Sequence, residues 1–337
     1  MRDGGRPVSA ALDLLFIGGT GIISSASVRL AVERGHRVTV LNRGRTSIRP
    51  LPSEVEVLTA DVRDQAAVDE ALGSREFDAV AQFLAFTTEH VQPDLERFAG
   101  RTGQYVFVSS ASAYQKPPAS LPVTESTPLR NPFWQYSRDK IACEDLLVGA
   151  YRDRDFPAVI VRPSHTYDDA SLPTLGGWTD IARMRAGRPV VVHGDGTTQW
   201  TLTHTDDFAV GFVGLLGRPE THGSAYTITG ESAPTWNQVY TWLADAADGE
   251  ADLVHVASET IARELPEKGD GLIGDKAHSM VFDTTRLRRL VPEFTTTVPY
   301  VVGARRAIAW YDAHPDHQRV DADLDAAFDR LVERARG

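Results

Sequence analysis

The sequence predicts an α/β protein with a doubly wound parallel sheet and a smaller C-terminal lobe. Over the first half of the chain, short apolar runs alternate with helical stretches, a pattern typical of parallel strands joined by crossover helices. After Arg162-Pro163 the pattern loosens, and Pro, Gly and Trp recur. The chain has 337 residues, and at roughly 150 residues per domain this length also favours two lobes.

Each element is predicted from its own stretch of sequence. Leu12 to Ile17 is an apolar run typical of a buried strand, and a helix is predicted from Ile22 to about Arg34. The other predicted strands are 37–41, 55–59, 77–83, 104–108 and 158–161, and the other predicted helices are 65–72, 89–98 and 135–151. The charged, amphipathic tail from Asp321 to Arg336 predicts a solvated surface helix.

Composition narrows the range of partners. Lys and Arg total 35 against 46 Asp and Glu, a net charge of −11. Such a field repels phosphate backbones, so we expect no nucleic-acid partner. The single cysteine, Cys143, excludes a disulfide framework and a cysteine-built zinc site, and we expect no metal. The start lacks a secretory-type apolar run, and the first apolar stretch is far shorter than the roughly 20 residues of a membrane helix, so we expect a cytoplasmic protein with no membrane partner.

A glycine-rich turn follows the first predicted strand. Its residues are Gly18, Gly19, Thr20, Gly21, Ile22 and Ile23. Small residues let the backbone approach a pyrophosphate, and the N-terminus of the next helix offers free N–H groups and partial positive charge. This strand–turn–helix–strand order predicts a dinucleotide site in a Rossmann domain. Ser24 replaces the third glycine, so packing of the helix on the strand must admit a hydroxyl.

The end of the second predicted strand bears on which dinucleotide is bound. An acidic residue there would bind the ribose 2′-hydroxyl of NAD. The chain instead has Asn42, Arg43 and Arg45, and both guanidinium groups could pair with the 2′-phosphate of NADP, so NADP is slightly favoured over NAD. The alternative is that they are ordinary loop arginines. Asp61 and Val62 are expected near the adenine, although Asp61 could instead cap the following helix.

A tyrosine and a lysine stand four residues apart at the start of a predicted helix. This spacing places Tyr136 and Lys140 on one helix face. An ammonium beside a phenol favours phenolate, so we expect Lys140 to lower the pKa of Tyr136 below its usual value of about 10. Upstream, the strand 104–108 ends in hydroxyls, including Ser110 and Ser112. Such a hydroxyl could bind a substrate oxygen while the tyrosine takes or gives its proton.

With these motifs in this order, the chain resembles the extended short-chain dehydrogenase/reductase family, the NAD(P)-dependent sugar-nucleotide epimerases and dehydratases. The resemblance runs from Leu14 to about Gly230. It implies that Ser110, Tyr136 and Lys140 are catalytic, with Lys140 also holding the nicotinamide ribose. Other segments that resemble the family are Arg162-Pro163 with Tyr167, Gly194-Asp195-Gly196, and His204 with Asp206-Asp207.

Departures from the family pattern bear on the substrate. Family dehydratases carry an Asp-Glu pair after the catalytic hydroxyl, whereas Ala111-Ser112 follows Ser110 here, so elimination of water is disfavoured. His165 stands where epimerases often have an asparagine that touches the substrate. We therefore predict that Ser112 and His165 contact the substrate; the alternative for His165 is a turn histidine bonded to backbone.

Trp200 stands where many sugar-nucleotide enzymes have an arginine that clamps the diphosphate. A neutral aromatic ring cannot pair with phosphate but can stack on a sugar ring, so we predict that Trp200 contacts the substrate. The alternative is that Trp200 belongs to the core and that another arginine clamps the diphosphate. The candidates are Arg183, Arg185 and Arg188.

These patterns divide the chain and predict its function. Residues 8–165, completed by 200–230, form the predicted dinucleotide-binding domain, and residues 166–199 and 231–337 form the substrate lobe over the carboxyl ends of the strands. We predict an NAD(P)-dependent oxidoreductase or epimerase that transfers hydride at a secondary alcohol or ketone of a sugar-type small molecule, and a homodimer is possible. Two alternatives stay open. One is an NADPH-dependent reductase of a non-sugar ketone, and the other, from a resemblance to chloroplast stem-loop binding proteins, is a non-catalytic RNA-binding protein.

Overall fold

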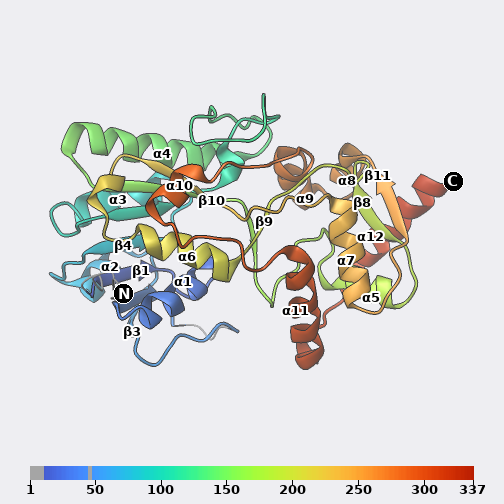
Figure 1. Ribbon diagram of the computed structural model, residues 1–337, viewed down its shortest axis with the longest axis horizontal. Helices are drawn as coiled ribbons and strands as arrows, with labels where there is room; N and C mark the ends of the chain where they lie inside the picture. Colours follow the sequence, from blue (N-terminus) through green and yellow to red (C-terminus); the bar gives the residue numbers. More distant parts are fainter. Residues whose placement is uncertain (1–10, 45–47) are drawn as a thin grey trace, which may run out of the picture.

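The centre of the computed structural model, which describes residues 11–44 and 48–337, is a seven-stranded parallel sheet (Figure 1). The strand order is β10-β6-β5-β4-β1-β2-β3. The bounds are β1 Asp13–Ile17, β2 Arg37–Asn42, β3 Glu56–Thr59, β4 Ala79–Gln82, β5 Tyr105–Val108, β6 Ala158–Pro163 and β10 Ala225–Ile228. The order reverses between β1 and β4, and sheets of this kind bind ligands at that switch point. The predicted doubly wound α/β fold is confirmed.

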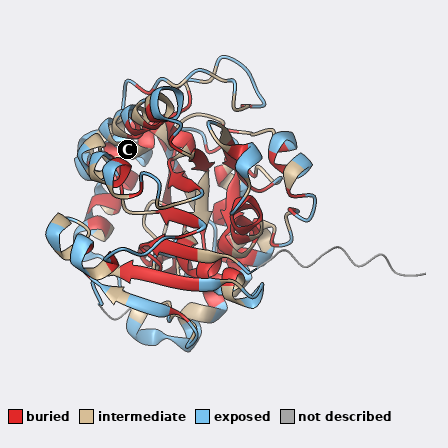
Figure 2. Ribbon diagram, turned by 90° about the vertical axis from the view of Figure 1, so that its left-hand side faces the viewer, coloured by how far each residue is buried: buried red, intermediate tan, exposed pale blue. Residues whose placement is uncertain are grey.

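Helices cover both faces of the sheet, as strands that are apolar on both faces require. One face carries α1 (Ile22–Glu33) and α6 (Thr205–Leu215), and the other carries α2 (Gln65–Leu72), α3 (Thr88–Arg97) and α4 (Gln135–Arg154). Phe208 and Phe212 of α6 are fully buried on the first face, as Leu147 of α4 is on the second. Figure 2 shows most of the strands buried between helices whose outer surfaces are exposed, whereas the edge strand β3 is largely exposed. The core of this domain therefore lies on both sides of the sheet.

The second lobe lies beside the sheet domain and is mostly helical (Figure 1). Its elements are α5 (Trp178–Arg185), β8 (Val190–His193), α7 (Trp236–Ala246), β11 (Leu253–Val256), α8 (Ser258–Glu264), α9 (Pro266–Gly271), α11 (Tyr300–Ala313) and α12 (Ala322–Arg336). Two parallel pairs accompany them, β8 with β11 and, towards the sheet domain, β7 (His165–Tyr167) with β9 (Leu202–His204). Short turns complete the description: 3-10 turns at Ala111–Ala113, Pro219–Thr221 and Pro315–His317, and a π-helical turn at Leu272–Lys276. Within residues 11–44 and 48–337, none of the helices has the length and apolar composition that a membrane span requires.

The predicted boundary of the second lobe is wrong near residue 290. Helix α10 (Thr285–Leu290) returns to the sheet domain, where Leu287, Val291 and Phe294 are fully buried beside α6. Gly214 of α6 makes this packing possible, because a Cβ at that position would lie 2.4 Å from Val291. Residues 231–337 are therefore not one continuous segment of the second lobe, because the chain returns to the sheet domain at α10.

The C-terminal helix is not the solvated surface helix that its charge predicts. Phe328 and Leu331 of α12 are buried against β8 and β11. On the same helix, Asp325 accepts a hydrogen bond of 2.6 Å from Arg183, which is itself buried. The amphipathic pattern was therefore a docking face, and the helix is part of the second core.

Candidate active site

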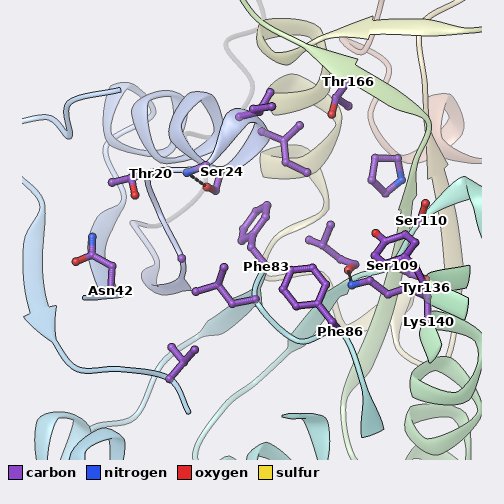
Figure 3. Close-up of a pocket in the computed structure, with 18 of the residues that line it drawn as sticks. Thr20, Ser24, Asn42, Phe83, Phe86, Ser109, Ser110, Tyr136, Lys140 and Thr166 are labelled. Atoms are coloured by element: carbon purple, nitrogen blue, oxygen red, sulfur yellow. Dashed lines mark hydrogen bonds between the residues drawn. The ribbon is translucent and has the colours of Figure 1, made fainter. Parts of the chain in front are cut away.

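A cavity of about 670 Å³ runs along the carboxyl ends of the strands at the switch point. Its wall contains most of the predicted cofactor and catalytic residues, namely Gly18, Thr20, Gly21, Ile22, Ile23, Asn42, Arg43, Asp61, Val62, Ser110, Tyr136 and Lys140. In Figure 3, Thr20 and Asn42 lie at one end of the cavity and Tyr136 and Lys140 at the other. The fold therefore brings together segments that lie more than a hundred residues apart. Arg45 lies outside the described residues.

The glycine turn is packed so closely that side chains do not fit. Gly18 has a φ of +88°, and a Cβ there would lie 2.5 Å from Leu84. A Cβ at Gly19 would lie 2.6 Å from Val40 of β2. These contacts leave the backbone as the surface that faces the cavity, which is what a pyrophosphate needs. The turn therefore fits a dinucleotide.

Ser24 explains how the chain tolerates a hydroxyl in place of the third glycine. Gly21 stands at the N-cap of α1, and its N–H donates a 2.9 Å hydrogen bond to Ser24 Oγ. Ser24 is buried, so its hydroxyl would be costly without this partner. The serine thus satisfies one of the free N–H groups of the helix end.

The far end of the cavity lies at the loops after β2 and β3. Arg43 is exposed at the rim, and Asn42 Oδ1 accepts a 2.8 Å hydrogen bond from the Gly44 N–H. Arg63 also lines the cavity, and its guanidinium donates to the carbonyl of Leu84 at 2.7 Å. Arg63 was not among the predicted site residues, although its place just after a parallel strand is a signal that could have found it.

Asp61 lines the cavity and does not cap the next helix. Its Oδ1 accepts a 3.0 Å hydrogen bond from the N–H of Arg63. The cap of α2 is Asp64, which accepts from the N–H of Ala67 at 3.1 Å. The capping alternative for Asp61 is therefore wrong, because Asp64 already fills that role.

The three predicted catalytic residues meet at the other end of the cavity. Ser110 follows β5, and Tyr136 and Lys140 lie on the first two turns of α4, which starts beside the end of that strand. Lys140 Nζ donates to the backbone carbonyls of Ala85 at 2.7 Å and Val108 at 2.8 Å. Burial lowers the pKa of Lys140 to about 8. The lysine is thus held by backbone groups rather than by an acidic partner.

The expectation that Lys140 lowers the pKa of Tyr136 is wrong in this structure. Burial raises the pKa of Tyr136 to about 12, and the hydrogen bond with Ser110 offsets this only in part. The Lys140 ammonium lies 5.8 Å from the centre of the Tyr136 ring and points its hydrogens at the two carbonyls. Burial is therefore the main cause of the shift in the Tyr136 pKa, and the phenol stays protonated at neutral pH.

A chain of hydroxyls leads from inside the protein to Ser110. Ser137 Oγ donates to Ser112 Oγ at 2.8 Å, and Ser112 Oγ lies 2.9 Å from Ser110 Oγ. The side-chain amide of Asn131 donates to Ser137 Oγ at 3.2 Å. Its Oδ1 accepts from the N–H of Phe133, which fixes the orientation of the amide. Because an amide N–H can only donate, Ser137 accepts from Asn131 and donates to Ser112. Either hydroxyl can donate in the contact between Ser112 and Ser110, and the hydrogen bond that Ser112 accepts from Ser137 favours Ser112 as that donor.

A second cavity, of about 390 Å³, adjoins the first at Ser110 and Tyr136. All three predicted substrate residues, Ser112, His165 and Trp200, line it. Burial and the charge of Lys276 lower the pKa of His165 to about 3, so its imidazole is neutral at physiological pH. The structure thus brings the predicted substrate residues to the catalytic end of the first cavity.

Trp200 belongs to the core of the second lobe and also lines the second cavity. Its side chain is buried, and the ammonium of Lys116 lies 5.5 Å from its ring centre. The proposed diphosphate clamps do not line either cavity, because each pairs with a carboxylate elsewhere. The pairs are Arg183 and Arg188 with Asp325 and Asp329, and Arg185 with Asp312. The alternative that one of these arginines clamps a diphosphate is therefore wrong.

Several residues of the second cavity were not predicted. Asp275 and Lys276 come from the π-helical turn, and Trp134 and Phe282 complete an aromatic wall. The π-helical turn is bound to the hydroxyl chain, because the amide of Asn131 also donates to the carbonyl of Gly274 at 2.7 Å. No local motif marks these residues, since the fold of the second lobe brings them to the site.

The remaining family-like segments hold the site together. Arg162 forms a buried ion pair with Glu144 of α4 and donates to the hydroxyl of Tyr114 at 3.1 Å. His204 caps α6, and the carboxylate of Asp207 accepts hydrogen bonds from residues 297–298. These side chains join α4, α6 and the second lobe to the sheet, so their role in this structure is positional.

A doubly wound sheet with a glycine turn, and a Ser–Tyr–Lys set at the far end of one cavity, define a dinucleotide-dependent enzyme. The model of the NAD dependent epimerase/dehydratase family matches residues 14–229. The chain belongs to this family, and its relatives include a reductase and several epimerases. The predicted family and the prediction of an enzyme are confirmed.

Relatives and solved structures agree with this assignment. The chain is 28% identical to 2′-dehydrokanamycin reductase of Streptomyces kanamyceticus over 294 residues, 86% of this chain and 82% of that protein. It is 28% identical to the chloroplast stem-loop binding protein of 41 kDa b of Arabidopsis thaliana over 260 residues, 73% of this chain and 66% of that protein. The fold is similar to that of dTDP-glucose 4,6-dehydratase of Bacillus anthracis in complex with NAD, with a TM-score of 0.72, 15% identity, and coverage of 91% and 98%.

Proposed function

We propose that this protein is an NADP-preferring oxidoreductase that reduces a ketone of a sugar-type substrate. The observation that carries the proposal is the meeting of the two cavities at Ser110 and Tyr136. A dinucleotide held by the glycine turn occupies the first cavity, and a compound of one or two rings fits the second. The reacting carbon then lies beside the phenol of Tyr136.

The protonation state of the site is suited to reduction. The dinucleotide, when bound, supplies the hydride. Ser110 donates a hydrogen bond to the ketone oxygen, and Tyr136 gives that oxygen its proton. A phenol with a pKa raised to about 12 is protonated at neutral pH, as a proton donor must be. The relative named as 2′-dehydrokanamycin reductase also supports this direction.

The preference for NADP rests on the charge at the rim of the first cavity. Arg43 and Arg63 both line this end, and burial together with the charge of Arg43 lowers the pKa of Arg63. Two guanidinium groups close enough to repel each other are stabilised by a bound phosphate. No carboxylate ends β2, where a residue that binds the 2′-hydroxyl of NAD would stand.

Fluorescence titration with NADPH and NADH tests the cofactor proposal. We expect tighter binding of NADPH and a gap that shrinks in Arg43→Ala by about 10- to 100-fold, since a hydrogen bond to a charged group contributes about 1.5–3 kcal/mol. Arg75→Ala is the matched control, because Arg75 pairs with Glu56 and does not line the cavity. Equal affinity for the two dinucleotides in the unmodified protein would contradict the NADP proposal.

The reaction is tested on the protein as purified. Mass spectrometry of the extract shows which dinucleotide is bound and in which redox state. A panel of ketosugars, sugars and sugar nucleotides is then followed by the absorbance of the reduced nicotinamide. We expect net consumption of NADPH with a ketosugar. Turnover without net change in NADPH identifies an epimerase, and failure to bind any dinucleotide would refute the proposed function.

A further inference from the structure

The second cavity holds a charge that the proposed reaction does not use. Asp275 and Lys276 enter its wall from the π-helical turn Leu272–Lys276, a geometry often found at functional sites. The carboxylate of Asp275 is already neutralised, because Lys116 Nζ lies 3.0 Å from Asp275 Oδ1. Lys116 is fully buried, and its ammonium also lies 5.5 Å from the ring centre of Trp200, so we treat the pair as a fixed part of the structure.

Lys276 carries the positive charge in this wall that the pair of Lys116 and Asp275 does not neutralise. Among the residues that the structure describes, none forms an ion pair or a hydrogen bond with its ammonium. The ammonium lies near His165, because its charge contributes to the lowered pKa of that ring in the same wall. Burial also lowers the pKa of Lys276 itself, and the charge of the adjacent Asp275 offsets this only in part. A cation that has lost part of its water without gaining a partner is costly, and a bound anion offsets that cost.

The rest of the wall does not balance this charge. Among the described residues that line the cavity, Asp275 is the one carboxylate, and Lys116 occupies it. The phenol of Tyr136 and the imidazole of His165 are neutral at physiological pH. The formal charges of Lys116, Asp275 and Lys276 therefore sum to +1 at this cavity, in a protein whose net charge is −11.

We propose that Lys276 binds an anionic group, a carboxylate or a phosphate, that the substrate carries close to the reacting carbon. This inference rests on the proposed function, because Ser110 and Tyr136 line the same cavity. A volume of about 390 Å³ lies near the lower end of the ~300–1,000 Å³ range of small-molecule sites, so the anion is on the reacting ring or directly attached to it. The substrate is then an acidic sugar or a sugar phosphate, and an amino sugar is disfavoured.

Calorimetric titration of the NADPH-loaded protein tests the inference without turnover. The probes are glucuronate, glucose 1-phosphate, the neutral methyl glucoside and the cationic glucosamine. We expect one of the two anions to bind at least about 10-fold more tightly than methyl glucoside, with an advantage that shrinks as salt is added, and glucosamine to bind worst. The preferred anion distinguishes a carboxylate from a phosphate.

Variants assign the preference to one side chain. Lys276→Gln should abolish the advantage of the anion, whereas Lys276→Arg should keep it. Lys268→Gln is the matched control, since it removes a nearby lysine that does not line the cavity. Equal binding of charged and neutral probes by the unmodified protein, or a preference that survives Lys276→Gln, would overturn the inference. NADPH binding is titrated first, so a protein that binds no dinucleotide overturns the proposed function instead.

Discussion

The hydroxyl chain behind Ser110 predicts a catalytic defect in Ser137→Ala, a variant of a residue that lines neither cavity. Ser137 is fully buried, and its hydroxyl donates to Ser112 at 2.8 Å. Without that donor, an acceptor position on the Ser112 hydroxyl is free. Ser110 can then turn its own hydrogen to Ser112 instead of the substrate oxygen.

The expected loss of kcat depends on how many hydrogen bonds separate the substituted residue from the reacting oxygen. A direct donor to the reacting oxygen contributes about 2.7–4 kcal/mol to the transition state, so Ser110→Ala should lose roughly 10²- to 10³-fold in kcat. Ser137→Ala removes one hydrogen bond that acts through two others. A net contribution of about 0.5–1.5 kcal/mol corresponds to roughly a 2- to 12-fold loss in kcat. KM should stay unchanged, because Ser137 does not touch the substrate.

The assay is steady-state kinetics with the panel compound that turns over, followed by the reduced nicotinamide. Ser137→Thr keeps a hydroxyl and should recover most of the activity. The exposed Ser126 provides a control, and Ser126→Ala should leave kcat unchanged. Normal kcat in Ser137→Ala, or a defect confined to KM, would refute the reasoning.

Substitutions of Tyr136, Gly19 and Lys140 test other parts of the site. Tyr136→Phe should lower turnover by roughly 10²-fold or more and leave NADPH binding intact. The phenolate absorbance that this variant removes should titrate in the unmodified protein near pH 12, well above the usual range of a tyrosine. Normal turnover in the variant would show that another group transfers the proton. Gly19→Ala places a Cβ 2.6 Å from Val40, so thermal unfolding should report a loss of about 1–3 kcal/mol and NADPH binding should weaken, whereas Gly149→Ala, which meets no atom within 4 Å, should do neither. The pKa of Lys140 is about 8 in the folded protein and about 10.4 in an unfolded chain, so the unfolded state binds more protons between these values. The Lys140 contribution to stability should therefore rise with pH across that window, and denaturation of the unmodified protein and Lys140→Met should show the rise only in the former.

Much of the sheet and of the first cavity could be predicted because the signals are local. The glycine turn, the loop after β2 and the Tyr136–Lys140 pair each lie at the end of one strand or the start of one helix. In a parallel sheet the carboxyl ends of all strands lie at one edge, so separate local motifs can be assigned to one site.

The rest depends on burial and on contacts across the chain. Lys276 reaches the cavity from a π-helical turn 136 residues beyond Lys140, and no spacing rule joins the two. The direction of the Tyr136 pKa shift is decided by desolvation, which a sequence does not report. For α12, the same amphipathic pattern suits a solvated helix or a docked one, and the buried ring of Phe328 settles the question.

The route of the chain between the two lobes limits how this enzyme can be rebuilt. The chain builds the sheet domain up to β6 and then crosses to the second lobe. It returns to the sheet domain for α6 and β10, crosses again, and returns a second time at α10. Helices α11 and α12 then lie in the second lobe. A different specificity lobe therefore cannot be grafted as one continuous segment; at least three separate insertions would have to be exchanged together, each with its junctions. Because the chain crosses between the lobes several times, we expect the unfolding of one lobe to disrupt the other, so that thermal denaturation occurs in a single cooperative step.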